Sequence, residues 1–153
     1  MLKRMLIFFI ILIYNSVFTK IVAEEIPIIV IAPSKKAQSL SAVGTSVTIL
    51  DEKFFNKSSE YFLGDALSTS TTGANFFQSG GHGSASAIQL RGMPKRYSTV
   101  YIDGVKMSDP SSVSNDFEFN HILTSQVSRV EILKGNQSSI YGSGAIGGTI
   151  HIT

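Results

Sequence analysis

The stretch from Val127 to Thr153 reads VSRVEILKGNQSSIYGSGAIGGTIHIT. It combines a strand pattern, a short helical turn at Ser138–Tyr141, a segment with five glycines between Gly135 and Gly148, and a second strand pattern at its end. Gly142 is placed to end the helical turn in the left-handed conformation. Because the second strand pattern begins just as the sequence stops, we expect further protein to follow.

The first strand of this stretch has two chemically different faces. Since side chains alternate along a strand, one face carries Val130 and Ile132, and the other carries Arg129, Glu131 and Leu133. Two charges on one face predict that this face meets water or an oppositely charged wall.

The N-terminus has the layout of a secretory signal. Two basic residues at Lys3 and Arg4 precede an apolar run from Met5 to Tyr14, and Ala23 is a small residue at a suitable cleavage point. The apolar run is shorter than the ~20 residues of a membrane span. We therefore assign Met1–Ala23 as a signal peptide.

Composition without this signal excludes some functions. The 153-residue chain carries a formal charge of +2, but without Lys3, Arg4 and Lys20 it has 10 basic and 11 acidic residues, a net charge of −1. This balance gives no basic stripe for nucleic acid. The chain has no cysteine, so we expect an exported domain of this size to gain its rigidity from a partner rather than from disulfides.

Ile28–Ala32 is a β-branched run between two prolines and predicts an extended segment. It is either a buried first strand or an exposed strand that adds to the edge of a partner's sheet. The composition by itself favours the buried strand. Ser34–Ser39 is a polar linker under either interpretation.

The next part of the chain alternates strands and short helices. Val43–Leu50 predicts a strand, and Asp51 an N-cap for a helix through Asn56. A second helix is expected from Ser58 or Ser59, with Gly73 beyond its end. Its core face is formed by Phe62, Leu63, Ala66 and Leu67.

Loops and a hairpin dominate the middle of the chain. Ser79–Ser86 is rich in glycine and is either a flexible hairpin loop or a contact loop for a ligand. Asp103 and Gly104, between two strand patterns, predict a two-residue β-hairpin. The loop Ser108–Phe119 contains several oxygen donors, but they lack the spacing of a helix-loop-helix calcium site. Asn120–Gln126 has room for two helical turns at most.

Motifs for other functions do not fit. Gly142–Gly147 matches G-x-G-x-x-G, but a strand pattern follows it where a dinucleotide site needs a helix. His82, His121 and His151 are scattered, and no serine lies in a nucleophile elbow. We therefore expect neither an enzyme nor a resident cofactor, with calcium in the loops as the one cofactor left open.

Three linked segments resemble the plug domain of TonB-dependent outer-membrane receptors. They are IQLRG at Ile88–Gly92, VYIDGV at Val100–Val105, and RVEILKGNQSSIYGSGAIGG at Arg129–Gly148. The similarity is closest to the cobalamin receptor type, whose plug has a similar Gly-Gly-x-Gly loop before the Arg-Gly strand. This sequence departs from the family at Asn136, where proline is usual.

The resemblance implies an α+β fold: a small mixed β-sheet with short helices and long loops, lodged in a 22-stranded barrel that this chain lacks. It implies a signal peptide at 1–23, a TonB-binding segment and linker at 24–39, and a plug at 40–153. It also reverses the interpretation of the N-terminal run, because such receptors carry a TonB-binding strand there. The residues concerned are Ile28, Ile29, Val30, Ile31 and Ala32, and the linker would transmit the pull.

The resemblance also implies contact residues. Substrate-contact loops would include Ser79, Gly80, Gly81, His82, Gly83, Ser84, Lys106, Ser108, Asp109 and Asp116. Plug–barrel contacts would be made by Arg91, Arg129 and Glu131. The expected partners are TonB, the barrel, and a scarce nutrient such as cobalamin or a ferric siderophore, at the outer membrane of a Gram-negative bacterium. The alternative is a standalone periplasmic binding domain without transport activity.

Overall fold

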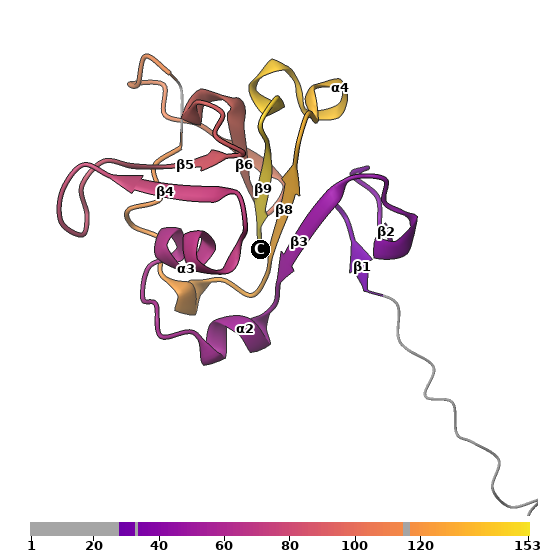
Figure 1. Ribbon diagram of the computed structural model, residues 1–153, viewed down its shortest axis with the longest axis horizontal. Helices are drawn as coiled ribbons and strands as arrows, with labels where there is room; N and C mark the ends of the chain where they lie inside the picture. The colour runs from indigo at the N-terminus through magenta and orange to yellow at the C-terminus, as the bar shows by residue number, and fades with distance from the viewer. Residues whose placement is uncertain (1–27, 33, 115–116) are drawn as a thin grey trace, which may run out of the picture.

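A five-stranded mixed sheet forms the centre of the structure, a computed structural model that describes residues 28–32, 34–114 and 117–153. Its strands run in the order β3, β8, β9, β6, β7 (Figure 1). All neighbours are antiparallel except β6 and β9, which are parallel. The bounds are β3 Ser46–Leu50, β6 Ser98–Ile102, β7 Val105–Met107, β8 Val130–Lys134 and β9 Gly148–Ile152.

One face of this sheet builds the hydrophobic core. Buried side chains of β3, β6, β8 and β9 pack against two helices, α2 (Glu52–Lys57) and α3 (Leu63–Ser70), and against a separate hairpin. That hairpin joins β4 (Ala74–Gln78) to β5 (Ser86–Leu90). The core residues include Leu50, Phe55, Leu63, Leu67, Ile88, Leu90, Val100, Val130, Ile132, Ile150 and Ile152.

Smaller elements complete the chain. A two-stranded sheet pairs β1 (Ile29–Val30) with β2 (Gln38–Ser39), so the linker expected at Ser34–Ser39 ends in a strand. The short helices are η1 Leu40–Ala42, η2 Lys95–Tyr97, η3 Thr124–Gln126, α4 Ser138–Tyr141 and η4 Ser143–Ala145. The signal peptide assigned to Met1–Ala23 lies outside the described residues.

The mixed sheet with few short helices confirms the predicted fold class. Asp51 caps α2 as expected, because its carboxylate accepts a hydrogen bond of 3.0 Å from the backbone N–H of Phe54. Asp103 and Gly104 have φ of 49° and 81°, which confirms the predicted hairpin turn between β6 and β7.

The start of α3 was predicted too early. Phe62 is not helical but forms a β-bridge with Leu123, and the N–H of Leu63 donates to the carbonyl of Ile122 at 2.9 Å. This long-range pairing holds the residues before Leu63 extended. Only η3 forms in the segment expected to hold up to two helical turns. At Gly142 φ is positive, 86°, but ψ is 176°, so the residue is extended rather than left-handed helical.

Helices in the described part of the chain are short, and α3 has 8 residues. None of those within residues 28–32, 34–114 and 117–153 has the length and apolar character required to cross a membrane. Gly64 lets α3 pack closely on β4, since a Cβ there would lie 2.3 Å from the Phe76 ring.

We expect Gly148→Ala to destabilise the fold by about 2–3 kcal/mol or more. Gly148 has φ of 146°, and an added Cβ would lie 2.2 Å from the backbone oxygen of Leu133 on the neighbouring strand. That oxygen cannot move away without breaking the pairing of β8 with β9. Urea unfolding of the full chain measures the change. Gly81→Ala is the matched control, because no heavy atom lies within 4 Å of its added Cβ. Equal stability of the two variants would contradict the prediction.

Candidate functional site

The second face of the central sheet carries a row of side chains in register across all five strands. Glu131 on β8 is the Cα partner of Ile49 on β3 and of His151 on β9. His151 is in turn paired with Tyr101 on β6, and Tyr101 with Lys106 on β7. Because the core lies on the opposite face, this row is free to meet another part of the protein.

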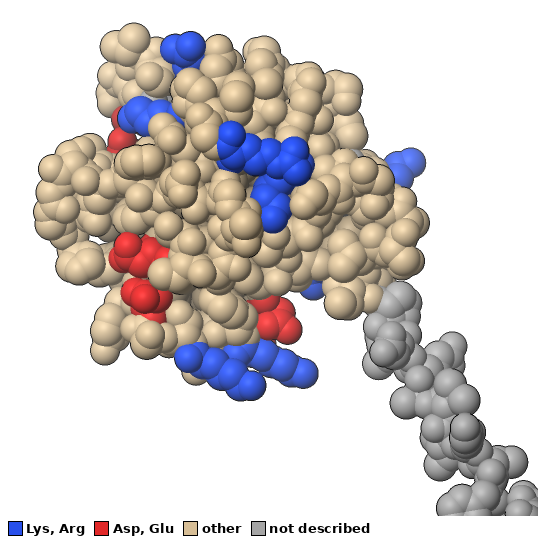
Figure 2. Space-filling model, in the orientation of Figure 1, with Lys and Arg blue, Asp and Glu red and all other residues tan. Residues whose placement is uncertain are grey.

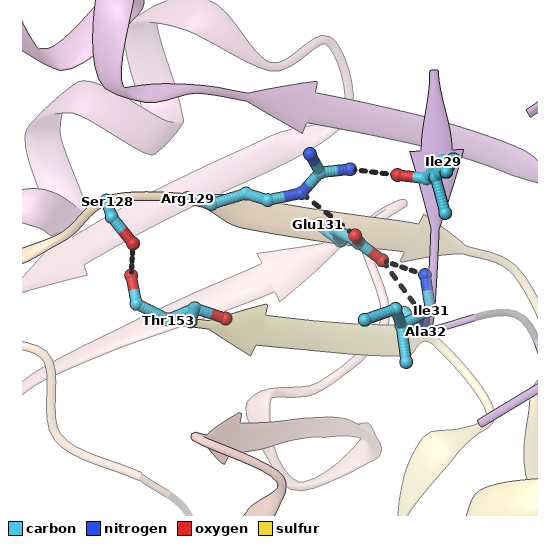
Figure 3. Close-up of polar contacts among 7 residues, drawn as sticks. All are labelled: Ile29, Ile31, Ala32, Ser128, Arg129, Glu131 and Thr153. Atoms are coloured by element: carbon cyan, nitrogen blue, oxygen red, sulfur yellow. Dashed lines mark hydrogen bonds and ion pairs between the residues drawn. The ribbon is translucent and has the colours of Figure 1, made fainter. Parts of the chain in front are cut away.

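The N-terminal segment Ile29–Ala32 lies across this row at Glu131. One carboxylate oxygen of Glu131, Oε2, accepts hydrogen bonds from the backbone N–H groups of Ile31 at 3.0 Å and Ala32 at 2.9 Å (Figure 3). The other, Oε1, accepts from Nε of Arg129 at 2.9 Å. Arg129 also donates through Nη2 to the backbone oxygen of Ile29.

A tyrosine completes the contact. The Tyr141 hydroxyl, from α4, donates to the backbone oxygen of Ala32. Val30 and Ala32 are 0% and 2% exposed, whereas Ile29 and Ile31 are 52% and 57% exposed. The segment therefore alternates between buried and exposed side chains, which combines the two interpretations that the sequence allowed.

Burial shapes the electrostatics of the row. The pKa of His151 is lowered to about 4, chiefly by desolvation and also by Lys35, while nearby Glu131 acts in the opposite direction. Desolvation, assisted by Tyr101 and Glu131, raises the pKa of Tyr141 to about 12. His151 is therefore neutral at pH 7. It does not compete as a cation with Arg129 and the backbone N–H groups of the segment for the carboxylate of Glu131.

Aromatic rings fill the space beside the N-terminal segment Ile29–Ala32. The His151 and Tyr101 rings are stacked with centroids 4.8 Å apart, and Nζ of Lys35 lies 5.0 Å from the centre of the Tyr141 ring. Together with the exposed isoleucines of the segment they line a groove of about 790 Å³. The sequence did not predict that these aromatic residues lie together, because the pairing of β6 with β9 that stacks His151 on Tyr101 is non-local.

Arg129 and Glu131 were expected to face a barrel wall, and the structure shows them facing the chain's own N-terminal segment. The alternative that this face of β8 meets water is wrong for Glu131, which is 6% exposed. The covering residues come from about 100 positions earlier in the sequence. Contact of this pair with a barrel stays a prediction.

Arg91, the third expected barrel contact, has a different environment. Its φ is 54°, an uncommon value for a residue with a side chain, and Gly92 follows with φ of 72°. A Cβ added to Gly135 would lie 3.2 Å from Nη1 of Arg91, so the guanidinium covers the turn after β8. Within the described ranges this guanidinium has no hydrogen-bond or ion-pair partner, which leaves it available to another chain.

The first expected substrate loop, Ser79–Ser86, lies away from the segment. The β4–β5 hairpin and β1 are on opposite sides of the molecule in Figure 1. In the hairpin loop, His82 stacks on Phe62 with ring centroids 4.7 Å apart, and Asn120 donates to the backbone oxygen of Gly83 at 3.1 Å. His82 and Gly83 are the central residues of the turn, which is closed by a hydrogen bond of 3.1 Å from the N–H of Ser84 to the backbone oxygen of Gly81, with Ser79 and Gly80 before it.

The residues of the second expected substrate loop lie in different parts of the structure. Lys106 lies within β7, and Ser108 and Asp109 follow it. The Asp109 carboxylate accepts hydrogen bonds from the N–H and hydroxyl of Ser111 at 2.9 and 2.6 Å. Asp116 lies outside the described residues. In the described part of the chain, no group of three or more His, Asp or Glu residues is arranged to hold a metal ion.

Charges on the surface are dispersed. On the face shown in Figure 2, basic side chains form separate groups and acidic ones lie among them. This face carries no continuous basic stripe of the kind that binds nucleic acid.

Residues 39–149 match the family described as TonB-dependent Receptor Plug Domain. The chain belongs to this family. Over 124 residues it is 30% identical to a vitamin B12 transporter, BtuB, of Vibrio vulnificus (strain CMCP6), a match that covers 81% of the chain and 20% of that protein. The plug therefore spans about a fifth of the length of the relatives it matches.

Solved receptor structures contain a similar fold. The ferric yersiniabactin uptake receptor FyuA of Yersinia pestis is 28% identical with a TM-score of 0.52, covering 73% of this chain and 17% of the receptor. The siderophore receptor PiuA of Acinetobacter baumannii is 25% identical with a TM-score of 0.55, covering 75% and 15%. The plug is thus a receptor domain and not an enzyme.

We predict that His151 makes the plug less stable as the pH falls from about 6.5 towards 4. The unfolded histidine takes up a proton near its ordinary pKa of about 6.5, whereas the folded one does so only at about 4. In this window the unfolded state binds more protons, so acid favours unfolding. Urea unfolding midpoints at several pH values measure the loss.

The matched variants are His151→Phe and His82→Phe. Phenylalanine at 151 can still stack on Tyr101 but cannot be protonated, so the acid-dependent loss should shrink. At His82, the same substitution should leave the loss unchanged. An equal loss in the wild type and His151→Phe would refute the assignment to His151.

Proposed function

We propose that this plug is the N-terminal portion of a TonB-dependent outer-membrane receptor for the active uptake of a scarce nutrient, cobalamin or a ferric siderophore. The family match over residues 39–149 carries the proposal. The similarity to a vitamin B12 transporter and to siderophore receptors supports both substrate classes. The plug would gate the barrel and couple it to TonB.

The Ile28–Ala32 segment is the proposed site of TonB binding. Strand addition uses backbone hydrogen bonds, so it needs an extended segment that can leave its own domain. Within Ile28–Ala32, only the two residues of β1 pair with another strand, β2. The side chains of Ile28, Ile29 and Ile31 are exposed. The linker Ser34–Ser39 would transmit the pull to the rest of the plug.

Nutrient contact is proposed at two loops of the plug, the first of which lies opposite the Ile28–Ala32 segment. The residues are those of the two expected loops, and the described ones are Ser79, Gly80, Gly81, His82, Gly83, Ser84, Lys106, Ser108 and Asp109. The separation of the β4–β5 hairpin from β1 in Figure 1 supports a division between ligand contact and TonB contact. Glycine-rich backbone in the first loop can approach a ligand closely.

Arg91 is the residue best placed for contact with the proposed 22-stranded barrel. Its guanidinium has no polar partner within the described ranges, and it lies over the turn at Gly135. An acidic group on the barrel wall would form an ion pair with this guanidinium. Arg129 and Glu131 could make such a contact only where the N-terminal segment leaves them free.

We place the protein in the outer membrane of a Gram-negative bacterium, with export directed by Met1–Ala23. The second candidate is a standalone periplasmic binding domain without transport activity. Cell fractionation of the natural gene product separates the two. Recovery with the outer membrane supports the receptor, and recovery in the soluble periplasm refutes it.

Deletion of Ile28–Ala32 should abolish cross-linking to TonB in cells, because it removes the strand that TonB would capture. A finer test compares two substitutions at one exposed position. Ile31→Pro removes a backbone donor and should lower cross-linking at least about ten-fold, while Ile31→Ala keeps the donor and should retain most of it. Unchanged cross-linking after the deletion would refute the assignment of this segment.

A further inference from the structure

We propose that Glu131, Arg129 and Tyr141 form a clamp that holds Ile29–Ala32 on the central sheet, so that the strength of this clamp sets how readily TonB captures the segment. The proposal deepens the proposed function and rests on its assignment of Ile28–Ala32 to TonB. Its own content is the identity of the residues that hold the segment and the mutual exclusion that follows from their contacts.

The clamp acts on the backbone of the segment. Glu131 accepts from the N–H groups of Ile31 and Ala32, and Arg129 and Tyr141 donate to the carbonyl oxygens of Ile29 and Ala32. Strand addition to a partner sheet uses the same kind of groups. A clamped segment therefore cannot pair fully with TonB, and the two states exclude each other.

Among the described residues, Glu131 makes two of the four side-chain hydrogen bonds that hold the backbone of the segment. A carboxylate that accepts backbone hydrogen bonds makes stronger bonds than a neutral acceptor, and here it does so at 6% exposure, where little water competes. Side-chain packing adds only Val30 and Ala32, because Ile29 and Ile31 point outward. Neutralising Glu131 should thus release the segment.

Arg129 is a positioning residue for this carboxylate. Its Nε binds Oε1 of Glu131 at 2.9 Å, which leaves Oε2 directed at the segment (Figure 3). Both charges belong to the C-terminal stretch that carries β8, so they stay on the sheet when the segment leaves. The clamp can therefore open without unfolding the plug.

A thiol placed under the clamp reports its opening. The chain has no cysteine, so Ala32→Cys introduces a single thiol at a position that is 2% exposed. Its rate of reaction with a maleimide in the full chain measures how often the segment leaves. Glu131→Gln should raise this rate by about ten-fold or more, since it weakens two charge-assisted hydrogen bonds. Tyr141→Phe, which removes one donor and keeps the ring, should raise it less.

Two controls separate local opening from general loss of structure. Glu118→Gln removes a carboxylate that also accepts a backbone N–H, that of Ser86, at a distant site, and should leave the reactivity of the thiol at position 32 unchanged. Ile150→Cys, made in a separate chain, places a thiol in the core at 0% exposure, and it should stay protected when Glu131 is replaced. Unchanged reactivity of the thiol at position 32 in Glu131→Gln would overturn the proposal.

If the core thiol also becomes reactive in Glu131→Gln, that substitution has unfolded the sheet. The labelling rate of the thiol at position 32 in Tyr141→Phe then tests the clamp. An increase at position 32 with the core thiol protected supports the clamp, and no increase overturns it.

Binding of purified TonB then separates the two proposals. Tighter binding by Glu131→Gln supports both, equal binding despite faster labelling overturns the link from clamp to capture, and failure of every form to bind TonB overturns the proposed function.

Discussion

The pairing of β8 with β9 in the centre of the sheet is the constraint on which the rest of the structure depends. Each strand has a neighbour on both sides, and Val130, Ile132 and Ile150 face the core without exposure to solvent. A shift of one residue would turn these side chains outward and bring Glu131 into the core. The register that packs the core therefore also fixes where the charged row lies.

A buried carboxylate is costly unless its lone pairs are satisfied. At Glu131 the compensation comes from one guanidinium and two backbone N–H groups, and the latter belong to a segment with little secondary structure of its own. Under the proposed function, the strand that TonB would capture is held by a carboxylate that needs hydrogen-bond donors.

Local chemistry made much of the fold predictable. The Asp51 cap, the Asp103–Gly104 turn and the alternation of faces in β8 follow from residue types a few positions apart, and each was found. The start of α3 was missed because it depends on pairing between Phe62 and Leu123, some 60 residues away. The grouping of Tyr101 and His151 near Glu131 was missed for the same reason, since it follows from the strand order.

The contact between Ile31 and Glu131 spans 100 residues of sequence, and this distance sets an order on folding. During synthesis from the N-terminus, the isoleucine-rich run appears long before the strand that covers it. Pairings so distant in sequence form late, because the closure of a long loop must be offset by contacts made at the same time. Until β8 is in place, this extended apolar run lacks the sheet face that covers it, so it can associate with other chains before the plug has folded.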